Sequence, residues 1–310
     1  MRVPGLTPQF RRIIVNIGTN IQYATAPTLY PRHAWKTIAE TLTEDHKQEA
    51  LNFLSLRPVN TVILAGWIRD HGIVSPKHRG IFYGCRDKKG DLVGIALIGR
   101  NLLFEADTDE AIEAFASRAR DCPDVRMVFA EEEKLNIFWS HYRGEMPMPR
   151  MTRHRLIKSG RFVSNGIESV EDLRLATRDD LQQIVSAHAE MVLAETGVDP
   201  LETDADGFRM RCAQRVDQGR VWVWMKGDEL LFKSDIVGVT PETTYIEGLW
   251  VDPKERGNGI GTRCLTTMCK NLLSGSNVVS GFLDSEHSLS NSLYRKAGFT
   301  EVDEYAKIYI

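Results

Sequence analysis

The segment from residue 245 to residue 272 constrains the fold of this chain more than any other part of the sequence. It begins with an apolar stretch (245–251), turns at Asp252 and Pro253, and runs into the glycine-rich sequence RGNGIG at 256–261. Apolar residues at the spacing of one helical face follow the glycines: Leu265, Met268, Cys269 and Leu272. The segment therefore predicts a strand, a tight loop and the start of a helix, in that order.

The start of a helix behind a glycine loop is a place where an anion can bind. The first backbone N–H groups have no partner inside the helix, and the helix dipole is positive there. Glycines let a phosphate approach the backbone because they carry no Cβ, and Arg256 adds a positive charge. No Gly-Lys-Ser or Gly-Lys-Thr sequence is present, which excludes a P-loop, and GxGxG late in the chain differs from the dinucleotide fingerprint. A tight turn without a ligand is the alternative, which the strand, the turn and Arg256 together disfavour.

The composition bounds the class of protein. With 310 residues the chain can form two cores, and 42% hydrophobic and 26% charged residues are ordinary for a globular protein. A net charge of −3 argues against a broad nucleic-acid-binding surface, and no apolar run approaches the roughly 20 residues that span a membrane. The cysteines are scattered without a CxxC pair, so we expect reduced thiols, no metal centre and a cytoplasmic protein without a signal peptide.

The periodicity divides the chain into two α/β units with a similar order of elements, as in a duplicated fold. Apolar positions predict a helical face from Trp35 to Leu42 and a short strand over 61–64. Around 143–169 the chain is rich in proline, glycine and charge, which is typical of a linker. We therefore expect four parts: a tail or docking strand (1–30), a first α/β domain (31–145), a linker (146–168) and a second α/β domain (169–310).

The second unit resembles the GNAT superfamily of N-acetyltransferases. The acyl-CoA loop of that family has the form Gln/Arg-x-x-Gly-x-Gly/Ala, and Arg256, Gly259 and Gly261 fill it in register. A second family feature is a helix that carries Leu-Tyr shortly before Gly-Phe, and residues 293–294 and 298–299 match it.

The resemblance covers residues 171–310 and is weaker before them. It implies an α/β (α+β) fold of two mixed-sheet GNAT-like domains, of the bacterial two-domain type in which the first domain is a degenerate copy. It also implies transfer of an acetyl group from acetyl-CoA to a primary amine by direct attack, without a metal, a nucleic acid or a membrane. The acceptor is a small molecule, an amino acid or a protein lysine. The alternatives are a non-catalytic acyl-CoA-binding regulatory module and a structural protein with a glycine loop.

The resemblance also assigns roles to individual residues. Glu247 would be the base that takes a proton from the amine, and Tyr294 the acid that protonates the leaving thiolate. The alternatives are a solvated strand residue for Glu247 and a packed aromatic for Tyr294. Where many members carry an Asn this chain has His287, and Asn291 would replace that contact. The residues expected to contact acetyl-CoA are Leu249, Trp250, Val251, Arg256, Gly257, Asn258, Gly259, Ile260, Gly261, Thr262 and Asn291.

The first unit has no matching loop. Four carboxylates stand where a donor loop would be expected and would repel a pyrophosphate: Glu105, Asp107, Asp109 and Glu110. We therefore expect one donor site, with the first unit shaping the acceptor pocket. The linker carries a basic run, which we interpret as a solvated connector, the alternative being a clamp for the CoA 3′-phosphate or for an acidic acceptor. Its members are Arg150, Arg153, His154, Arg155, Lys158 and Arg161.

Overall fold

The computed structural model describes residues 37–143, 147–160, 166–286 and 288–310. These residues belong to one compact unit. The predicted tail (1–30) lies outside the described residues, and so do Arg161 and His287. Among the described residues, no helix is long and apolar enough to cross a membrane.

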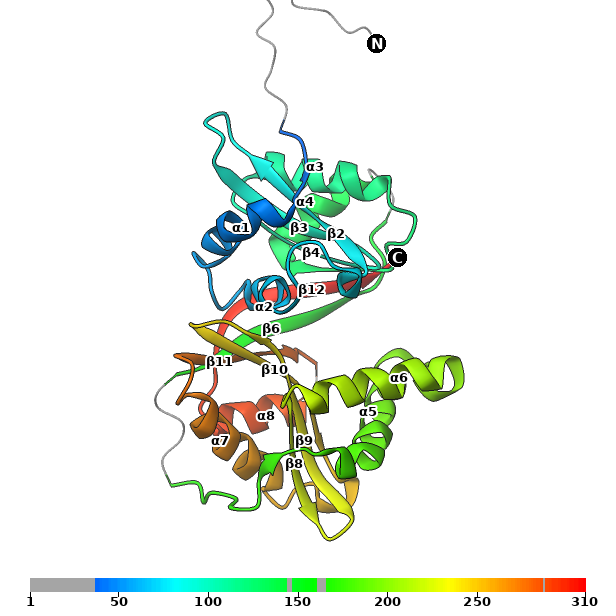
Figure 1. Cartoon of the computed structure of the whole chain (residues 1–310), viewed down its shortest axis with the longest axis vertical. Coiled ribbons are helices and arrows are strands. Elements are labelled where there is room, and N and C mark those ends of the chain that lie inside the picture. The colour runs from blue at the N-terminus through cyan, green and yellow to red at the C-terminus, as the bar shows by residue number, and fades with distance from the viewer. Residues whose placement is uncertain (1–36, 144–146, 161–165, 287) are drawn as a thin grey trace, which may run out of the picture. The chain divides into compact units, whose positions relative to one another are not determined.

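The chain repeats one order of elements twice: a strand, two helices, three strands, a helix, a strand, a helix and a strand (Figure 1). The first half consists of β1 (Glu40–Thr41), α1 (Lys47–Leu54), α2 (Val62–His71), β2 (Gly80–Arg86), β3 (Leu92–Gly99), β4 (Asn101–Ala106), α3 (Asp109–Arg120), β5 (Met127–Glu131), α4 (Glu132–Arg143) and β6 (Met151–Ser159). The second half consists of β7 (Arg174–Leu175), α5 (Leu181–Thr196), α6 (Pro200–Asp217), β8 (Val221–Lys226), β9 (Glu229–Val239), β10 (Thr243–Val251), α7 (Ile260–Leu272), β11 (Val278–Asp284), α8 (Ser288–Lys296) and β12 (Thr300–Tyr309). The mixed α/β fold class predicted from the sequence is confirmed, and the repeated order supports a duplication.

The two halves exchange their last strands within one 12-stranded sheet. The strand order is β1-β2-β3-β4-β5-β12-β6-β11-β10-β9-β8-β7. The last strand of the second half, β12, lies between β5 and β6, while β6 of the first half pairs with β11. Figure 1 shows β6 and β12 side by side at the middle of the molecule. Each half therefore needs the other half to complete its share of the sheet.

Strand β6 lies inside the stretch that the sequence assigned to a linker, and the domain boundaries stay a prediction. The interpretation of the basic run as a connector is wrong, because residues 151–159 form strand β6, which pairs with β11 and β12. Arg153 and Arg155 are also ion-paired to Glu132 and Glu301 at 2.9 Å. A strand is recognised in a sequence by alternating apolar and polar residues. β6 carries charged side chains that pair with acidic residues of neighbouring elements, so this pattern is missing.

Two further local expectations were wrong. The strand expected at 61–64 is the start of helix α2, whose residues Val62, Leu64, Ala65 and Ile68 are buried at helical spacing. The helical face expected up to Leu42 contains the edge strand β1, paired with β2. A short apolar run in a sequence does not distinguish a strand from a buried helix. In both segments the contacts with the rest of the fold determine which structure forms.

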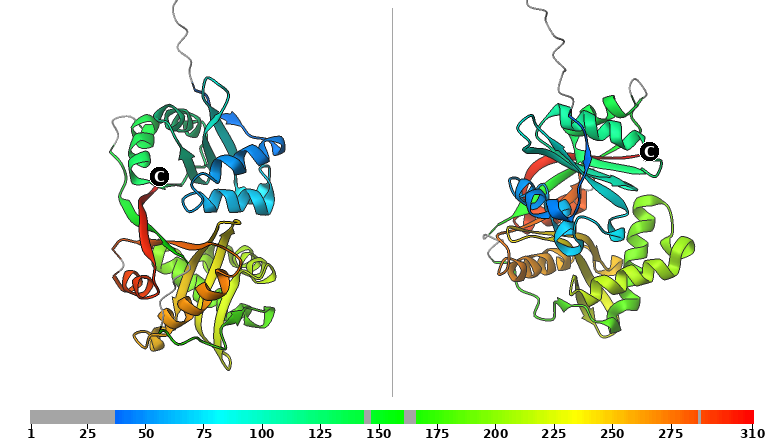
Figure 2. Two further views of the ribbon diagram at one scale, coloured as in Figure 1. Left: turned by 90° about the vertical axis from the view of Figure 1, so that its left-hand side faces the viewer. Right: turned by 45° about the horizontal axis from the view of Figure 1, so that its top comes forward.

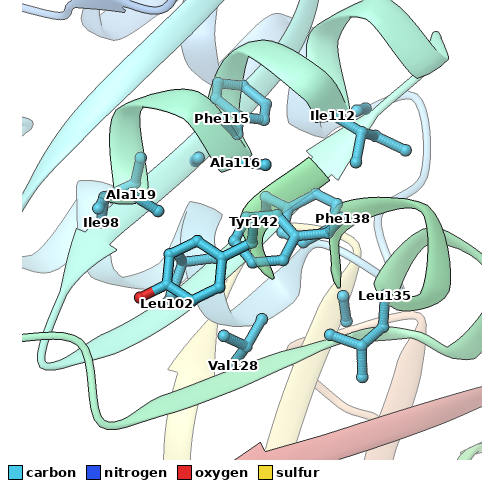
Figure 3. Close-up of a cluster of buried hydrophobic side chains, with 14 of the residues drawn as sticks. Ile98, Leu102, Ile112, Phe115, Ala116, Ala119, Val128, Leu135, Phe138 and Tyr142 are labelled. Atoms are coloured by element: carbon cyan, nitrogen blue, oxygen red, sulfur yellow. The ribbon is translucent and has the colours of Figure 1, made fainter. Parts of the chain in front are cut away.

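The core of the first half lies between α3, α4 and the sheet (Figure 3). The ring of Phe138 stacks on Phe104 at 5.5 Å and on Tyr142 at 5.4 Å, and Phe115 is fully buried beside them. Each such side chain stabilises the fold by about 1.5–3 kcal/mol relative to exposure.

In the second half, α7 and α8 cover one face of the strands, while α5 and α6 cover β8 and β9 from the other. Figure 2 shows helices flanking the strands of both halves on two sides. Helix α2 of the first half packs on β9 so closely that a Cβ at Gly66 would lie 2.8 Å from Gly238 Cα. An ion pair between Arg220 and Asp70 at 2.6 Å joins the halves nearby. The halves are thus held together by packing and charge as well as by strand exchange.

Candidate active site

Strands β10 and β11 separate after a short parallel ladder. They pair only where Thr243–Tyr245 lies beside Val278–Ser280. Beyond this ladder β10 continues to Val251 and β11 to Asp284 without pairing to each other. The separation leaves backbone groups of both strands facing a gap, where an extended ligand can pair as an added strand does at a sheet edge.

On its other side β10 carries a bulge against β9 at Gly248 and Leu249. Glu247 is opposite Asp235 and Trp250 is opposite Lys233, with a register shift between the two pairs. Gly248 has φ of 63°, in the left-handed region that favours glycine. A Cβ there would also lie 3.0 Å from Asp235 Oδ2, so the position has little room for a side chain.

A buried ion cluster lies beneath the bulge. Lys233, which is fully buried, donates to the Gly248 carbonyl at 3.0 Å and to Asp235 Oδ2 at 3.1 Å. Arg215 of α6 donates to the same Asp235 oxygen at 3.0 Å. Burial alone would raise the pKa of Asp235, but the two cations outweigh it, and the pKa lies below its usual value. The cluster is therefore charged and paired, and it fixes the bulge from below.

Glu247 lies on β10, two residues beyond its last pair with β11. Its carboxylate accepts a hydrogen bond from the Tyr245 hydroxyl at 3.4 Å and lies 3.8 Å from the Arg215 guanidinium. Although 40% of the side chain is exposed, the protein around it removes enough water to raise the pKa. Arg215 opposes this rise, while Asp235 and Glu195 add to it. A carboxylate whose pKa is raised is a better proton acceptor than an ordinary one.

The glycine loop connects the end of β10 to the first turn of α7. Gly257 and Gly259 have φ of 86° and 79°, and a Cβ on either would meet open space. Gly261 differs, because a Cβ there would lie 2.5 Å from Leu293 Cδ1 on α8. Gly257 and Gly259 thus leave the helix N-terminus accessible, whereas Gly261 lets α7 pack against α8.

Side chains around the loop tie it to β10 and α5. Arg256 Nε donates to the Val251 carbonyl at 3.1 Å, and its guanidinium lies 3.8 Å from Glu190. Trp250 Nε1 donates to the same Glu190 at 3.1 Å. Asn258 donates to Glu255 at 3.2 Å, within the loop itself. Of the other predicted donor contacts, Leu249 and Val251 pack against the core around α7, Ile260 is buried and Thr262 is half-buried.

Residues 217–301, which span the gap, the bulge and the loop, match the family model of the acetyltransferase (GNAT) domain. The chain carries a GNAT acetyltransferase domain. Comparison of the sequence with curated proteins gives no match.

Solved structures share the GNAT fold over most of the chain at low sequence identity. An acetyltransferase from the GNAT family of Colwellia psychrerythraea has 14% identity and a TM-score of 0.58, covering 89% of this chain and 100% of that one. A tandem GNAT protein from the clavulanic acid biosynthesis pathway has 14% identity and a TM-score of 0.54, covering 88% and 98%. A Drosophila protein has 11% identity and a TM-score of 0.61, covering 88% and 99%. At identities this low, the similarity shows that the fold is shared and nothing further.

Within the GNAT domain, Tyr294 is a buried residue of α8. Its ring meets Phe299 edge-on at 5.1 Å, and burial raises the pKa of its hydroxyl, with a smaller effect from Cys269 and Glu247. A tyrosine hydroxyl is protonated at neutral pH even without this shift, and the raised pKa makes this one a weaker acid. Asn291 donates to the carbonyls of Asp284 at 3.4 Å and of Ser285, so its amide closes the turn after β11.

Sequence reasoning missed Lys233 and Asp235 as site residues. They lie two apart in a run of the GNAT domain that is apolar except for Ser234 between them, so they point to the same face of a buried strand. That pattern was the available signal, because a buried charge needs a partner. His188 of α5 stacks on Phe208 at 5.3 Å and lies 3.9 Å from Asp235, and burial lowers its pKa to about 4.

Glu105 of the first half is at the position equivalent to Glu247. Glu105 lies two residues beyond the last parallel pair of β4 with β5, as Glu247 lies two residues beyond the last parallel pair of β10 with β11. There the carboxylate is buried and accepts from Arg57 at 2.9 Å and from Lys134. The connection from β4 to α3 is only residues 107–108, and Thr108 caps the helix by accepting from Ala111 N at 3.2 Å. Glu105 is thus part of an ion cluster and not of a loop, and this connection leaves no glycine loop for a pyrophosphate.

Proposed function

We propose that this protein is an N-acyltransferase that moves an acetyl group from acetyl-CoA to a primary amine by direct attack. The observation that carries the proposal is the separation of β10 from β11, with a glycine loop and a helix N-terminus after β10 and with Glu247 on the separated part of β10. A gap between strands suits the extended pantetheine arm, and the start of α7 suits the pyrophosphate.

The residues of the donor side fit acetyl-CoA as a substrate. Gly257 and Gly259 leave open space at the start of α7, where the pyrophosphate would accept backbone N–H bonds. Arg256 is half exposed beside the loop and adds a positive charge. The unpaired edge of β10 from 246 to 251 would bond to the amide groups of the arm.

The chemistry needs two proton transfers. The nitrogen of the amine attacks the thioester carbonyl, the C–N bond forms, and the C–S bond breaks with release of the thiolate. Glu247 takes the proton that the nitrogen loses, directly or through a water molecule, and its raised pKa supports this role. Tyr294 gives a proton to the thiolate, since its phenol is protonated at neutral pH; the raised pKa makes this phenol a weaker acid than an exposed tyrosine. Lys233 and Asp235 hold the bulge, and with it Glu247, in place.

The proposal is tested by measuring CoA release and acetyl-CoA affinity in parallel. We expect micromolar to millimolar binding of acetyl-CoA, as is usual for enzyme substrates, and amine-dependent release of CoA from a panel of primary amines. A non-catalytic acyl-CoA-binding module would bind acetyl-CoA and release nothing with any amine. A structural protein with a glycine loop would show no rise in melting temperature with acetyl-CoA.

A further inference from the structure

A cavity of about 490 Å³ is formed mainly by residues of the first half. It is bounded by the end of α3 and the connection to β5, by the end of α4, and by the residue that follows β12. The described residues that line it all lie outside the gap, the bulge and the glycine loop. The volume is within the range of small-molecule sites in proteins. The lining residues are Arg120, Cys122, Pro123, Val125, Arg126, Tyr142, Arg143 and Ile310.

Carbonyl oxygens hold two of the three arginines that line the cavity. Arg120, the last residue of α3, donates to the carbonyl of His141 on α4. Arg126 donates to the carbonyls of Pro123 and Val125 at 2.8 Å and 3.0 Å. These bonds orient the two guanidinium groups. A carbonyl has no formal charge, so the bonds leave both positive charges in place.

The third arginine, Arg143, lies over the ring of Tyr142, with Cζ 4.7 Å from the ring centroid. This cation–π contact does not neutralise the charge either. Only 6% of Tyr142 is exposed, and the side chain lines the cavity. Among the described residues its hydroxyl has no hydrogen-bond partner, and Figure 3 shows the hydroxyl pointing away from Phe138. A buried hydroxyl without a partner is unfavourable, so this one is a donor available to a ligand.

No carboxylate pairs with these three arginines in the part of the chain that the structure describes. Other arginines of the first half are paired, such as Arg57 with Glu105 and Arg86 with Glu49. The chain as a whole has a net charge of −3, so three unpaired cations around one cavity are a local feature. Like charges around a cavity repel each other, and a bound anion removes this repulsion.

We propose that the cavity binds a small organic anion with at least two negative charges, either a dicarboxylate or a phosphate ester. Guanidinium groups bind both chemistries through charge-assisted hydrogen bonds. The Tyr142 hydroxyl donates a further bond, and the apolar side chains of Val125 and Ile310 contact the carbon skeleton. The inference goes beyond the proposed function, because this site requires neither acetyl-CoA nor an amine. Failure of either proposal leaves the other intact.

The thiol of Cys122 reports on this cavity. It is half-buried and lines the cavity, whereas the other four cysteines are buried. The rate at which iodoacetamide alkylates Cys122 in the full chain, followed by mass spectrometry at constant ionic strength, therefore measures occupancy of the cavity and not of the glycine loop. The probes are succinate and glycerol phosphate, and succinamide and glycerol are their uncharged counterparts.

We expect at least one of the two anions to slow the alkylation about threefold or more, with half of the effect at about 1 mM or below, as is usual for probes this small. Slowing by succinate alone assigns the site to dicarboxylates, and slowing by glycerol phosphate alone assigns it to phosphate esters. The inference is overturned if neither anion slows the reaction, or if the uncharged counterparts slow it equally.

Substitution of the arginines separates a binding role from a structural one. Arg126→Gln and Arg143→Gln should each weaken binding of the effective anion about tenfold, and Tyr142→Phe several-fold. The melting temperature of the unliganded variants should stay near that of the parent, because neither arginine is ion-paired. Lys88→Gln is the matched control. It removes an exposed charge before β3, whereas the cavity lies by residue 100 at the other end of that strand, where Arg126 N donates to the carbonyl of that residue. Parent-like binding in both arginine variants, or an equal loss in Lys88→Gln, would refute the site.

Discussion

Lys233 donates a hydrogen bond from a fully buried ammonium to the carbonyl of Gly248, over 3.0 Å. This bond joins β9 and β10 at the bulge of β10, in the part of β10 that is not paired with β11. Because the same ammonium also pairs with Asp235, the bulge and the buried charge depend on each other. The position of Glu247, one residue before Gly248, follows from this arrangement.

Lys233→Met is expected to destabilise the protein. The variant removes one of the two cations that pair with the buried Asp235, and it removes the hydrogen-bond donor of the Gly248 carbonyl. Breaking a buried ion pair lowers the free energy of unfolding by about 3–5 kcal/mol. Urea unfolding of parent and variant measures the change. The double variant Lys233→Met/Asp235→Leu should recover part of the loss, since it removes both charges. A cost below about 1 kcal/mol for the single variant would contradict the role given to Lys233.

Gly259→Asp should abolish acetyl-CoA binding without unfolding the protein. Gly259 has φ of 79° and open space around it, so the variant suffers modest backbone strain and places a negative charge at the start of α7. Gly227→Asp is the matched control, because Gly227 has φ of 58° and open space in the β8–β9 turn, away from the loop. Calorimetry should find that Gly227→Asp binds acetyl-CoA with the affinity of the parent protein. Gly261 is unsuitable for this test, since a side chain there would collide with Leu293.

The strand–loop–helix segment could be predicted from the sequence because its signals are local. Glycines, a turn and a helical period fall within one stretch, and the structure places β10, the loop and α7 as expected. The capping box formed by Thr177 and Asp180 before α5 is a local signal of the same kind, and its hydrogen bonds are present.

What the sequence did not reveal depends on contacts between distant residues. β6 shows no apolar alternation in the sequence because it carries several charged residues. Its arginines are paired with Glu132 and Glu301, which lie on other elements. Lys307 and Glu195 are also far apart in the chain, and only the strand exchange brings them together. Pairings of this kind depend on the tertiary structure, whereas local patterns are enough to predict the glycine loop and the start of α7.

Tyr294→Phe should lower kcat far more than it weakens acetyl-CoA binding. A proton donor acts mainly in the transition state, and its loss costs about 10²-fold or more. Removal of the hydroxyl leaves the edge-on contact with Phe299 in place, so the fold should be retained. Tyr142→Phe, in the core of the first half, is the control for removal of a buried hydroxyl. Unchanged kcat in Tyr294→Phe would make Tyr294 a packing residue.

The pH dependence of kcat/KM tests Glu247 as the base. Its active form is the carboxylate, so kcat/KM falls as the pH drops through its pKa, which lies above the ordinary 4.5. Arg215→Gln removes a cation that lowers this pKa, so the acid limb should move to higher pH. Glu247→Gln should abolish the limb and lower kcat/KM about 10²-fold. An acid limb at the same pH in all three proteins would assign the base to another group.

One acetyl-CoA should bind to each chain, although the fold is repeated. In the first half the residue equivalent to Glu247 is Glu105, which is buried between Arg57 and Lys134, and the helix that follows is capped by its own Thr108. In that half, the carboxylate is therefore paired with two cations of the protein, and the helix start is capped by a side chain of the protein. The second half has its carboxylate partly exposed and its helix start open.

Calorimetry on the full chain measures this stoichiometry. A fragment of residues 165–310 would not serve, because it lacks β6, which lies between β11 and β12, and its sheet would be left with two unpaired edges. We expect a stoichiometry of about one for the parent and no binding by Gly259→Asp, since both results follow from a single helix N-terminus that is open to an anion. A stoichiometry near two, or residual binding of one equivalent in Gly259→Asp, would mean that the first half binds acetyl-CoA despite its occupied cluster. Arg57→Gln would then be the variant to examine, because Arg57 also contacts Asp303 of β12 at 3.3 Å and so links that cluster to the exchanged strand.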